Sequence, residues 1–294
     1  MSAVAPASSA VRAAPRPRRT LAGLPPMAAA AGVVLLLYVA TALTASLWAP
    51  FDPGAVLVGR PLQPPSLAHL FGTDGVGRDI FSRVVYGCRP VLVMALSATG
   101  IAIVIGTTMG LLAGFLRGWF DQIVMRITDV FISVPPLVLA LLIISALTNS
   151  TLVVVLTVAF IYVFRIARVV RAATLAVVTE DFVTYAVTRG DSVFSIIFVE
   201  ILPNIIGTVL VEFAVRSGFA IVFIGALGFL GFGAPPPTPE WGVMINEGRT
   251  SMTVSLWPVI APAAAMAVLV IALNLFTDGI SRLIGDGTTV RRRA

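Results

Sequence analysis

The chain has 294 residues, of which 58% are hydrophobic and 12% charged, with a formal net charge of +6. Several apolar runs reach about twenty residues, enough to cross roughly 30 Å of hydrocarbon, so the composition predicts an integral membrane protein. All 20 basic residues are Arg. Without Lys the chain cannot supply the phosphate-binding Lys of a P-loop or the amine of a Schiff base. One His and one Cys exclude a His/Cys zinc cluster and an intrachain disulfide.

Six membrane spans are predicted, which makes the fold class an all-α integral membrane protein. Residues 1–26 are rich in Ala, Pro and Arg and contain no acid, a composition that predicts disorder. The apolar run that follows is longer than the roughly 7–15 residues of a signal-peptide core, so we expect an uncleaved first span. The six-helix domain is predicted for residues 27–286 and a basic tail for residues 287–294. The spans are expected at residues 27–49, 91–115, 123–147, 151–170, 205–232 and 256–281.

The distribution of Arg predicts the orientation of the spans. With the N-terminus in the cytoplasm, 14 Arg lie inside or at the inner boundary and five lie outside. Because inner loops carry the excess of positive charge, both termini are expected in the cytoplasm. The polar segment between the fourth and fifth spans is then cytoplasmic, and so is the basic tail.

The first outer loop leads into the second span. Its residues 78–88 divide into an apolar and a polar face, which predicts a short interfacial helix. We expect Asp79 to pair with Arg83, four residues further on. A gate formed by residues 77–79 near the outer mouth is the alternative.

Proline shapes two other regions. The second outer loop, residues 233–242, is Pro-rich and is expected to be extended, with Trp241 returning to the membrane interface. Within the third span, Pro135 and Pro136 predict a kink, because proline removes a helical hydrogen bond and restricts the residue before it.

The segment between the fourth and fifth spans predicts a helix–Gly–helix elbow. Thr179 is expected to cap a short helix with acidic residues in its first turn, where the helix dipole favours them. Gly190 is expected to stop that helix. Asp191 or Ser192 then starts a second short helix, which Pro203 ends. A membrane protein that places such an elbow outside the bilayer presents a shaped surface, so we expect a docking partner.

Glu212 and Arg216 lie four residues apart within the fifth span. Charges inside a membrane are costly and often functional. The two side chains can neutralise each other in helix packing or between subunits. They can also line a pathway and contact the amino or carboxyl terminus of a substrate. The sequence leaves both interpretations open.

Four sequence strings, at residues 71–87, 196–204, 229–242 and 274–279, resemble the second (C-type) permease of the dipeptide, oligopeptide and nickel group of ATP-binding-cassette (ABC) importers. Their order relative to the spans also resembles the family, over residues 27–286. Where the family signature usually starts Glu-Ala-Ala, this chain has Thr184, Tyr185 and Ala186. Glu200 stands where many relatives have His.

The resemblance implies a non-catalytic permease subunit of a bacterial inner membrane importer. Its implied partners are a second permease, two ATPases that bind ATP and Mg²⁺, an extracytoplasmic solute-binding protein and membrane lipid, without nucleic acid. Short peptides are the implied substrates, with nickel and glutathione open. The implied ATPase-coupling residues are Thr184, Tyr185, Ala186, Arg189, Gly190, Asp191, Leu202 and Pro203.

Two other classes of function compete with the permease. An intramembrane aspartyl protease would use Asp129 and Asp278 to activate water. Each has an Arg within one helical turn, Arg126 and Arg282, and we expect these local ion pairs to keep the carboxylates ionised. A stand-alone ion-coupled carrier would need an unpaired acid at mid-membrane or inverted repeats. Glu212 is its candidate, with an Arg beside it.

Overall fold

The computed structural model describes residues 25–148, 150–235 and 237–291, without the side chains of residues 283–291. Residues 1–24 of the tail predicted for residues 1–26, and the last three residues of the basic tail predicted for residues 287–294, therefore lie outside the description. The helices are α1 (Pro26–Trp48), α2 (Ile80–Leu116), α3 (Gly118–Ser133), α4 (Pro136–Ala146), α5 (Thr151–Val177), α6 (Asp181–Arg189), α7 (Val193–Ser195), α8 (Leu202–Leu227), α9 (Trp241–Gly248) and α10 (Trp257–Arg291).

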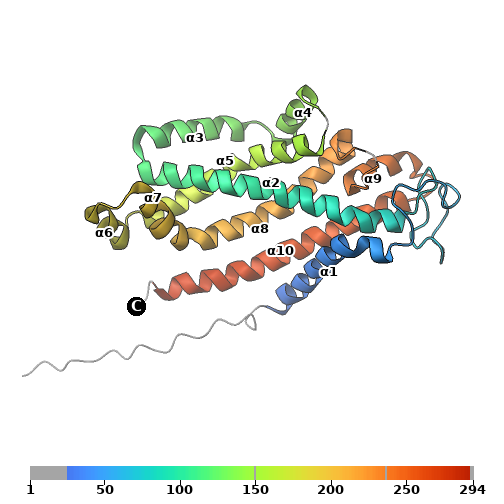
Figure 1. Ribbon diagram of the computed structural model, residues 1–294, viewed down its shortest axis with the longest axis horizontal. Helices are drawn as coiled ribbons and strands as arrows, with labels where there is room; N and C mark the ends of the chain where they lie inside the picture. Colours follow the sequence, from blue (N-terminus) through green and yellow to red (C-terminus); the bar gives the residue numbers. More distant parts are fainter. Residues whose placement is uncertain (1–24, 149, 236, 292–294) are drawn as a thin grey trace, which may run out of the picture.

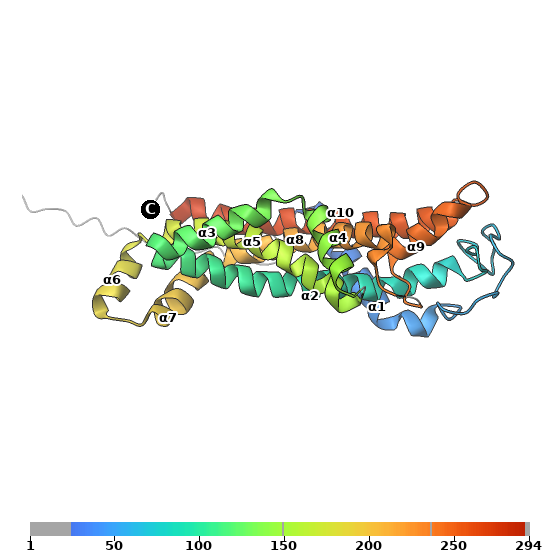
Figure 2. The same cartoon turned by 90° about the horizontal axis from the view of Figure 1, so that it is seen from above.

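The long helices lie side by side along one axis (Figures 1 and 2). α2 packs most extensively on α5, and α1 packs on α10. The short helices α6 and α7 lie at one end of the bundle, and α9 lies at the other with the segment that joins α1 to α2 (Figure 1). Five helical stretches are long and apolar enough to cross a membrane, and α3 with α4 makes a sixth if the bent pair is one span. The membrane prediction is therefore confirmed.

The third predicted span is broken. α3 and α4 meet at 90°, with Val134 between them in an extended conformation and Pro136 in the first turn of α4. Pro135 forbids the helical conformation to the residue before it, so α3 ends there. The kink predicted from the two prolines is confirmed.

Three glycines allow α2 and α5 to pack closely. Gly106, Gly110 and Gly114 recur every fourth residue and so share one face of α2. A Cβ atom on Gly110 would lie 2.6 Å from the carbonyl oxygen of Ala167 on α5. Small residues at this spacing bring helix backbones together inside a membrane. The pattern holds two of the central spans in contact.

The outer end of α2 differs from the prediction. α2 runs unbroken from Ile80 past Pro90, and the polar side chains of Ser82 and Arg83 are buried like the apolar ones. The prediction of a separate short helix is therefore wrong, and other parts of the chain cover its polar side.

Trp241 also departs from its expected place. Its side chain is fully buried, at 0% exposure. The indole Nε1 donates to the carbonyl oxygen of Val84 at 3.0 Å, and Gly87 leaves room for the ring. Trp241 opens α9, which packs on α10 and α8. The side chain of Trp241 is therefore part of the core at this end of the bundle and does not face lipid.

Pro203 does not end a helix. α7 continues through a π-helical segment, Ile196–Ile201, directly into α8. The backbone N–H of Leu202 bonds to the carbonyl of Ile197, five residues back. Pro203 then falls in the first turn of α8, directly after the π-helical segment, which changes the hydrogen-bond pattern at the point where its N–H is missing. The second arm of the elbow and α8 therefore form one continuous helix.

Candidate functional site

The elbow, residues 179–203, begins one residue later than predicted. The N-cap of α6 is Glu180, without a side-chain cap bond, and Asp181 lies in the first turn. The backbone N–H of Glu180 bonds to the carbonyl of Val177 at 3.0 Å. Thr179 lies inside this turn, so it does not cap α6.

The corner of the elbow is formed as predicted. Gly190 has φ 84°, in the left-handed region that glycine adopts without strain. Its N–H donates to the carbonyls of Ala186 and Val187. Ser192 then caps α7 by accepting the N–H of Ser195 at 3.2 Å. The stop at Gly190 and the restart at Ser192 are both confirmed.

The two arms of the elbow pack on each other. Val183 and Ala186 of α6 are buried, and α6 contacts the π-helical segment that contributes Ile197 and Ile201 to the same core cluster. This packing fixes α6 relative to α8. Val183 was not among the predicted site residues, although its spacing of three from Ala186 is the signal for a shared face.

The exposed surface of the elbow carries several apolar side chains among polar ones. Tyr185 is 67% exposed and Phe194 is 71% exposed, with Phe182 and Val187 also on the surface. Of the predicted coupling residues, Ala186 is buried, and Asp191 and Leu202 are partly buried. The exposed ones are Thr184, Tyr185, Arg189, Gly190 and Pro203.

One ion pair bridges the corner. Arg189 Nε donates to Asp191 Oδ1 at 2.9 Å, and the guanidinium lies 5.7 Å from the centre of the Tyr185 ring. The hydrogen bond from Arg189 lowers the pKa of Asp191, and the same bond raises the pKa of Arg189. Both groups therefore stay charged, and this face of the elbow offers a fixed pattern of charge beside exposed apolar rings.

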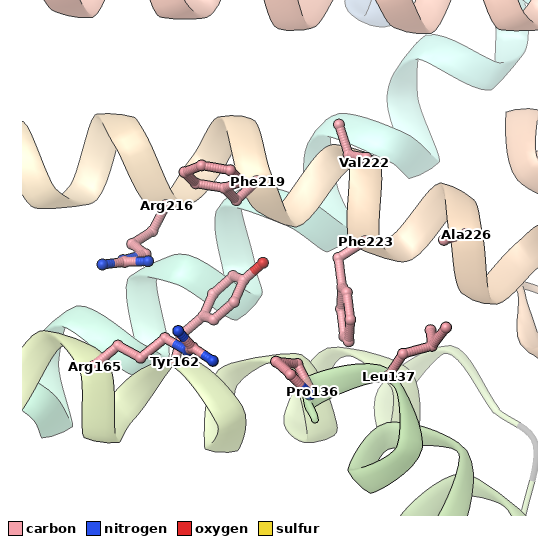
Figure 3. A pocket seen from close by; sticks show the side chains of 9 residues that line it. All are labelled: Pro136, Leu137, Tyr162, Arg165, Arg216, Phe219, Val222, Phe223 and Ala226. Carbon is pink, nitrogen blue, oxygen red and sulfur yellow. The ribbon is translucent and has the colours of Figure 1, made fainter. Parts of the chain in front are cut away.

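Glu212 and Arg216 form the ion pair that their spacing allows. Arg216 Nε donates to Glu212 Oε1 at 2.5 Å, and Glu212 is 8% exposed. Arg216 also lines a pocket of about 390 Å³. Figure 3 shows Arg216 and Phe223 directed from α8 toward α5. The remaining lining residues are Pro136, Leu137, Tyr162, Arg165, Phe219, Val222 and Ala226.

The carboxylates of the protease alternative are not brought together. Asp129 pairs with Arg168 of α5 and not with Arg126, because the face of α3 that carries it lies along α5. Asp278 and Arg282 make no ion pair in the described part of α10. α3 and α10 lie on opposite sides of the bundle (Figure 1). No shared proton is possible at that separation.

The end of the bundle opposite the elbow is held by a charge network. Arg83 NH1 lies 2.8 Å from Asp74 Oδ2 and 2.8 Å from Glu247 Oε2. Arg78 contacts the same two carboxylates, at 2.6 Å and 2.7 Å. The four residues form an outer latch between the first outer loop and α9. Glu247 could not be anticipated, because nothing in the sequence brings the two loops together.

Asp79 has other partners than the predicted Arg83. Its Oδ1 lies 2.9 Å from His69 Nδ1, and its Oδ2 accepts the N–H of Ser82 at 2.7 Å as the N-cap of α2. Capping directs the carboxylate toward the helix axis. The expected Asp79–Arg83 pair is therefore wrong, whereas the gate at residues 77–79 stays a prediction.

Replacement of Arg78 by Gln should loosen the outer latch. The change removes two charge-assisted contacts, worth about 1–3 kcal/mol together, while Arg83 still neutralises Asp74. We expect amide exchange in residues 56–79 to accelerate about tenfold, since 1.4 kcal/mol corresponds to a factor of ten. Hydrogen–deuterium exchange measures it. The control Arg60→Gln removes an exposed Arg of the same loop, and equal exchange in the two variants would contradict the latch.

Glu240 is a buried carboxyl outside the spans. It caps α9 by accepting the N–H groups of Gly242 and Val243 at 2.7 and 3.2 Å. A Cβ on Gly228 would lie 2.2 Å from its Oε2, so this glycine makes room for the carboxyl. Burial raises the pKa of Glu240 to about 7, against the opposing effect of the two hydrogen bonds.

This shift predicts a pH dependence of stability. Because the pKa is raised in the fold, the stabilisation by Glu240 is complete below about pH 4.5 and is lost as the pH rises through about 7. The free energy of unfolding falls by at most about 3 kcal/mol over this range. Glu240→Gln stays uncharged at every pH. We expect the Tm of the wild type minus that of the variant to fall between pH 5 and pH 8 in detergent. A constant difference would contradict the prediction.

Residues 106–289 match the family model described as the binding-protein-dependent transport system inner membrane component. The chain belongs to this family. It is a membrane-spanning, non-catalytic permease subunit of an ATP-driven importer in the inner membrane. The resemblance to the peptide and nickel group is thereby confirmed.

Individual relatives cover most of the chain. The glutathione transport system permease protein GsiD of Pectobacterium atrosepticum is 38% identical over 255 residues, 86% of this chain and 85% of that protein. GsiD of Escherichia coli O157:H7 is 38% identical over 86% of this chain and 84% of that protein. The dipeptide transport system permease protein DppC of Alkalihalophilus pseudofirmus is 36% identical over 247 residues, 84% of this chain and 80% of that protein.

Proposed function

We propose that this chain pairs with a homologous second permease to form a pathway for short peptides or glutathione. Two ATPases, which bind the ATP and Mg²⁺, dock on the elbow, and an extracytoplasmic solute-binding protein engages the other end. The chain crosses the membrane six times with both termini in the cytoplasm. The substrates named for the relatives support the choice of solute.

The exposed apolar side chains of the elbow carry this proposal. Tyr185 and Phe194 lie outside α8 and are largely exposed. A bound protein partner would cover these side chains. The elbow is rigid, because Gly190 fixes its corner and Val183 packs its arms. Its second arm continues into α8 without a break. A movement of the docked ATPases therefore reaches the span that holds Glu212 and Arg216, which we place along the pathway.

The proposal is tested by purifying the tagged chain together with the products of its neighbouring genes. The complex is reconstituted in liposomes with the binding protein, and uptake of labelled alanyl-alanine and glutathione is measured with and without ATP. Uptake that needs ATP and all partners supports the proposal. Uptake by the chain alone, driven by a proton or sodium gradient, would establish the carrier alternative, for which Glu212 is a weak candidate because Arg216 neutralises it.

A further inference from the structure

The pocket lined by Arg216 contains a second cation, Arg165 of α5. Arg165 lies fourteen residues after Thr151 and twelve before Val177, so it is roughly 20 Å from either end of its helix. Arg216 is fourteen residues after Leu202 and eleven before Leu227. Both arginines therefore lie near the middle of their own helices. Figure 3 shows Arg165 lying along α5 beside Tyr162, whose ring points toward α8.

The pocket has a surplus positive charge. Arg216 is paired with Glu212, and Arg165 makes no ion pair or side-chain hydrogen bond with any residue of the described ranges. Tyr162 is the one further titratable side chain among the lining residues that the structure gives. An ionisable residue inside a membrane usually faces a bundle interior or an aqueous cavity and marks a pathway. The missing counter-charge is therefore one that a ligand can bring.

The walls of the pocket restrict the ligand. The lining apart from the two arginines and the Tyr162 hydroxyl is apolar, including the rings of Phe219 and Phe223 and the edge of Pro136. A cavity of about 390 Å³ lies in the range of small-molecule sites. The planar fork of a guanidinium matches a carboxylate with two parallel hydrogen bonds.

We infer that Arg165 and Arg216 together bind a carboxylate of the transported solute in the pocket between α5 and α8, with the aromatic side chains against its apolar part. Glu212 is a positioning residue that holds the Arg216 guanidinium at the pocket. The inference rests on the proposed function and adds to it a chemical requirement, namely that the solute carries a free carboxylate.

The test uses the single Cys of the chain. In the intact complex in liposomes, Cys88 is replaced by Ala, and Phe219→Cys places a thiol in the pocket. The modification rate of this thiol is measured with an anionic sulfonate and a cationic trimethylammonium methanethiosulfonate reagent. A cleft of one charge raises the local concentration of counter-ions about tenfold or more. The ratio of the anionic to the cationic modification rate should therefore be about tenfold higher for this thiol than for a free thiol in solution.

Arg165→Gln should abolish this preference. The matched control Arg168→Gln removes the same charge one turn along α5, where Arg168 pairs with Asp129 outside the pocket, and should retain it. Alanyl-alanine should then slow the modification, whereas its C-terminal amide should not. Equal protection by both compounds, or by neither, would overturn the inference, as would a preference that Arg165→Gln leaves intact.

The outcomes separate this inference from the function. If the charge preference is absent while the ATPases remain bound and ATP-driven uptake persists, the carboxylate site is wrong and the permease stands. If the thiol reacts in detergent but not in liposomes, lipid fills the pocket and the site is also wrong. Loss of the ATPases from the unmodified complex would instead contradict the proposed function.

Discussion

Gly190→Pro should detach the ATPases from the complex while leaving the spans folded. Gly190 has φ 84° and its N–H serves two carbonyls of α6, whereas proline has φ near −65° and no N–H. The corner cannot keep its shape, so the exposed rings of α6 and α7 lose their relative position. A distortion of about 1.4 kcal/mol in the docked surface already lowers binding tenfold. We therefore expect at least a tenfold loss of co-purified ATPase and of ATP-driven uptake.

The control for this experiment is Gly190→Asn. Asn tolerates the left-handed conformation better than other residues with a Cβ, and a Cβ at this position meets nothing within 4 Å. It should retain most of the ATPase. The second permease should co-purify with the wild type and with both variants, because residue 190 lies outside the spans. If the Pro variant keeps its ATPases, the elbow is not the docking surface.

Features written in short stretches of sequence could be predicted. The six apolar runs, the kink at Pro135, the corner at Gly190 and the cap at Ser192 each depend on neighbours a few residues away. Hydrophobic length and proline or glycine chemistry act locally, so they are visible without the fold. The same holds for the pairing of Glu212 with Arg216, which share a helix face.

Features that depend on distant segments could not be predicted. Glu247 reaches Arg83 from 164 residues away, and Asp129 takes its partner from α5 instead of its own helix. Trp is a residue type that often lies at the membrane interface. The Trp241 side chain nevertheless packs in the core, where Gly87 leaves space for its ring. The cluster of Arg165 with Arg216 likewise exists only after α5 and α8 pack.

Pro203 illustrates a local rule that a neighbouring segment overrides. Proline after a short helix usually marks its end. Here the π-helical segment at Ile196–Ile201 shifts the hydrogen-bond pattern by one residue, so that Pro203 enters a new first turn. The functional consequence is continuity between the elbow and α8, which a true helix end would have interrupted.

Gly110→Leu should prevent the central spans from assembling. A Cβ at Gly110 would lie 2.6 Å from the Ala167 carbonyl oxygen and 2.8 Å from Val170 Cβ, and backbone atoms cannot yield as a flexible side chain does. α2 must move away from α5, which forfeits their packing along the Gly106–Gly114 face at a cost of about 3 kcal/mol or more. We expect little monodisperse protein after detergent extraction and a Tm lowered by several degrees in what remains. The control Gly100→Leu makes the same change on the same helix, where a Cβ meets nothing within 4 Å. It should extract and melt like the wild type, and equal behaviour of the two variants would mean that close approach of α2 and α5 does not hold the fold together.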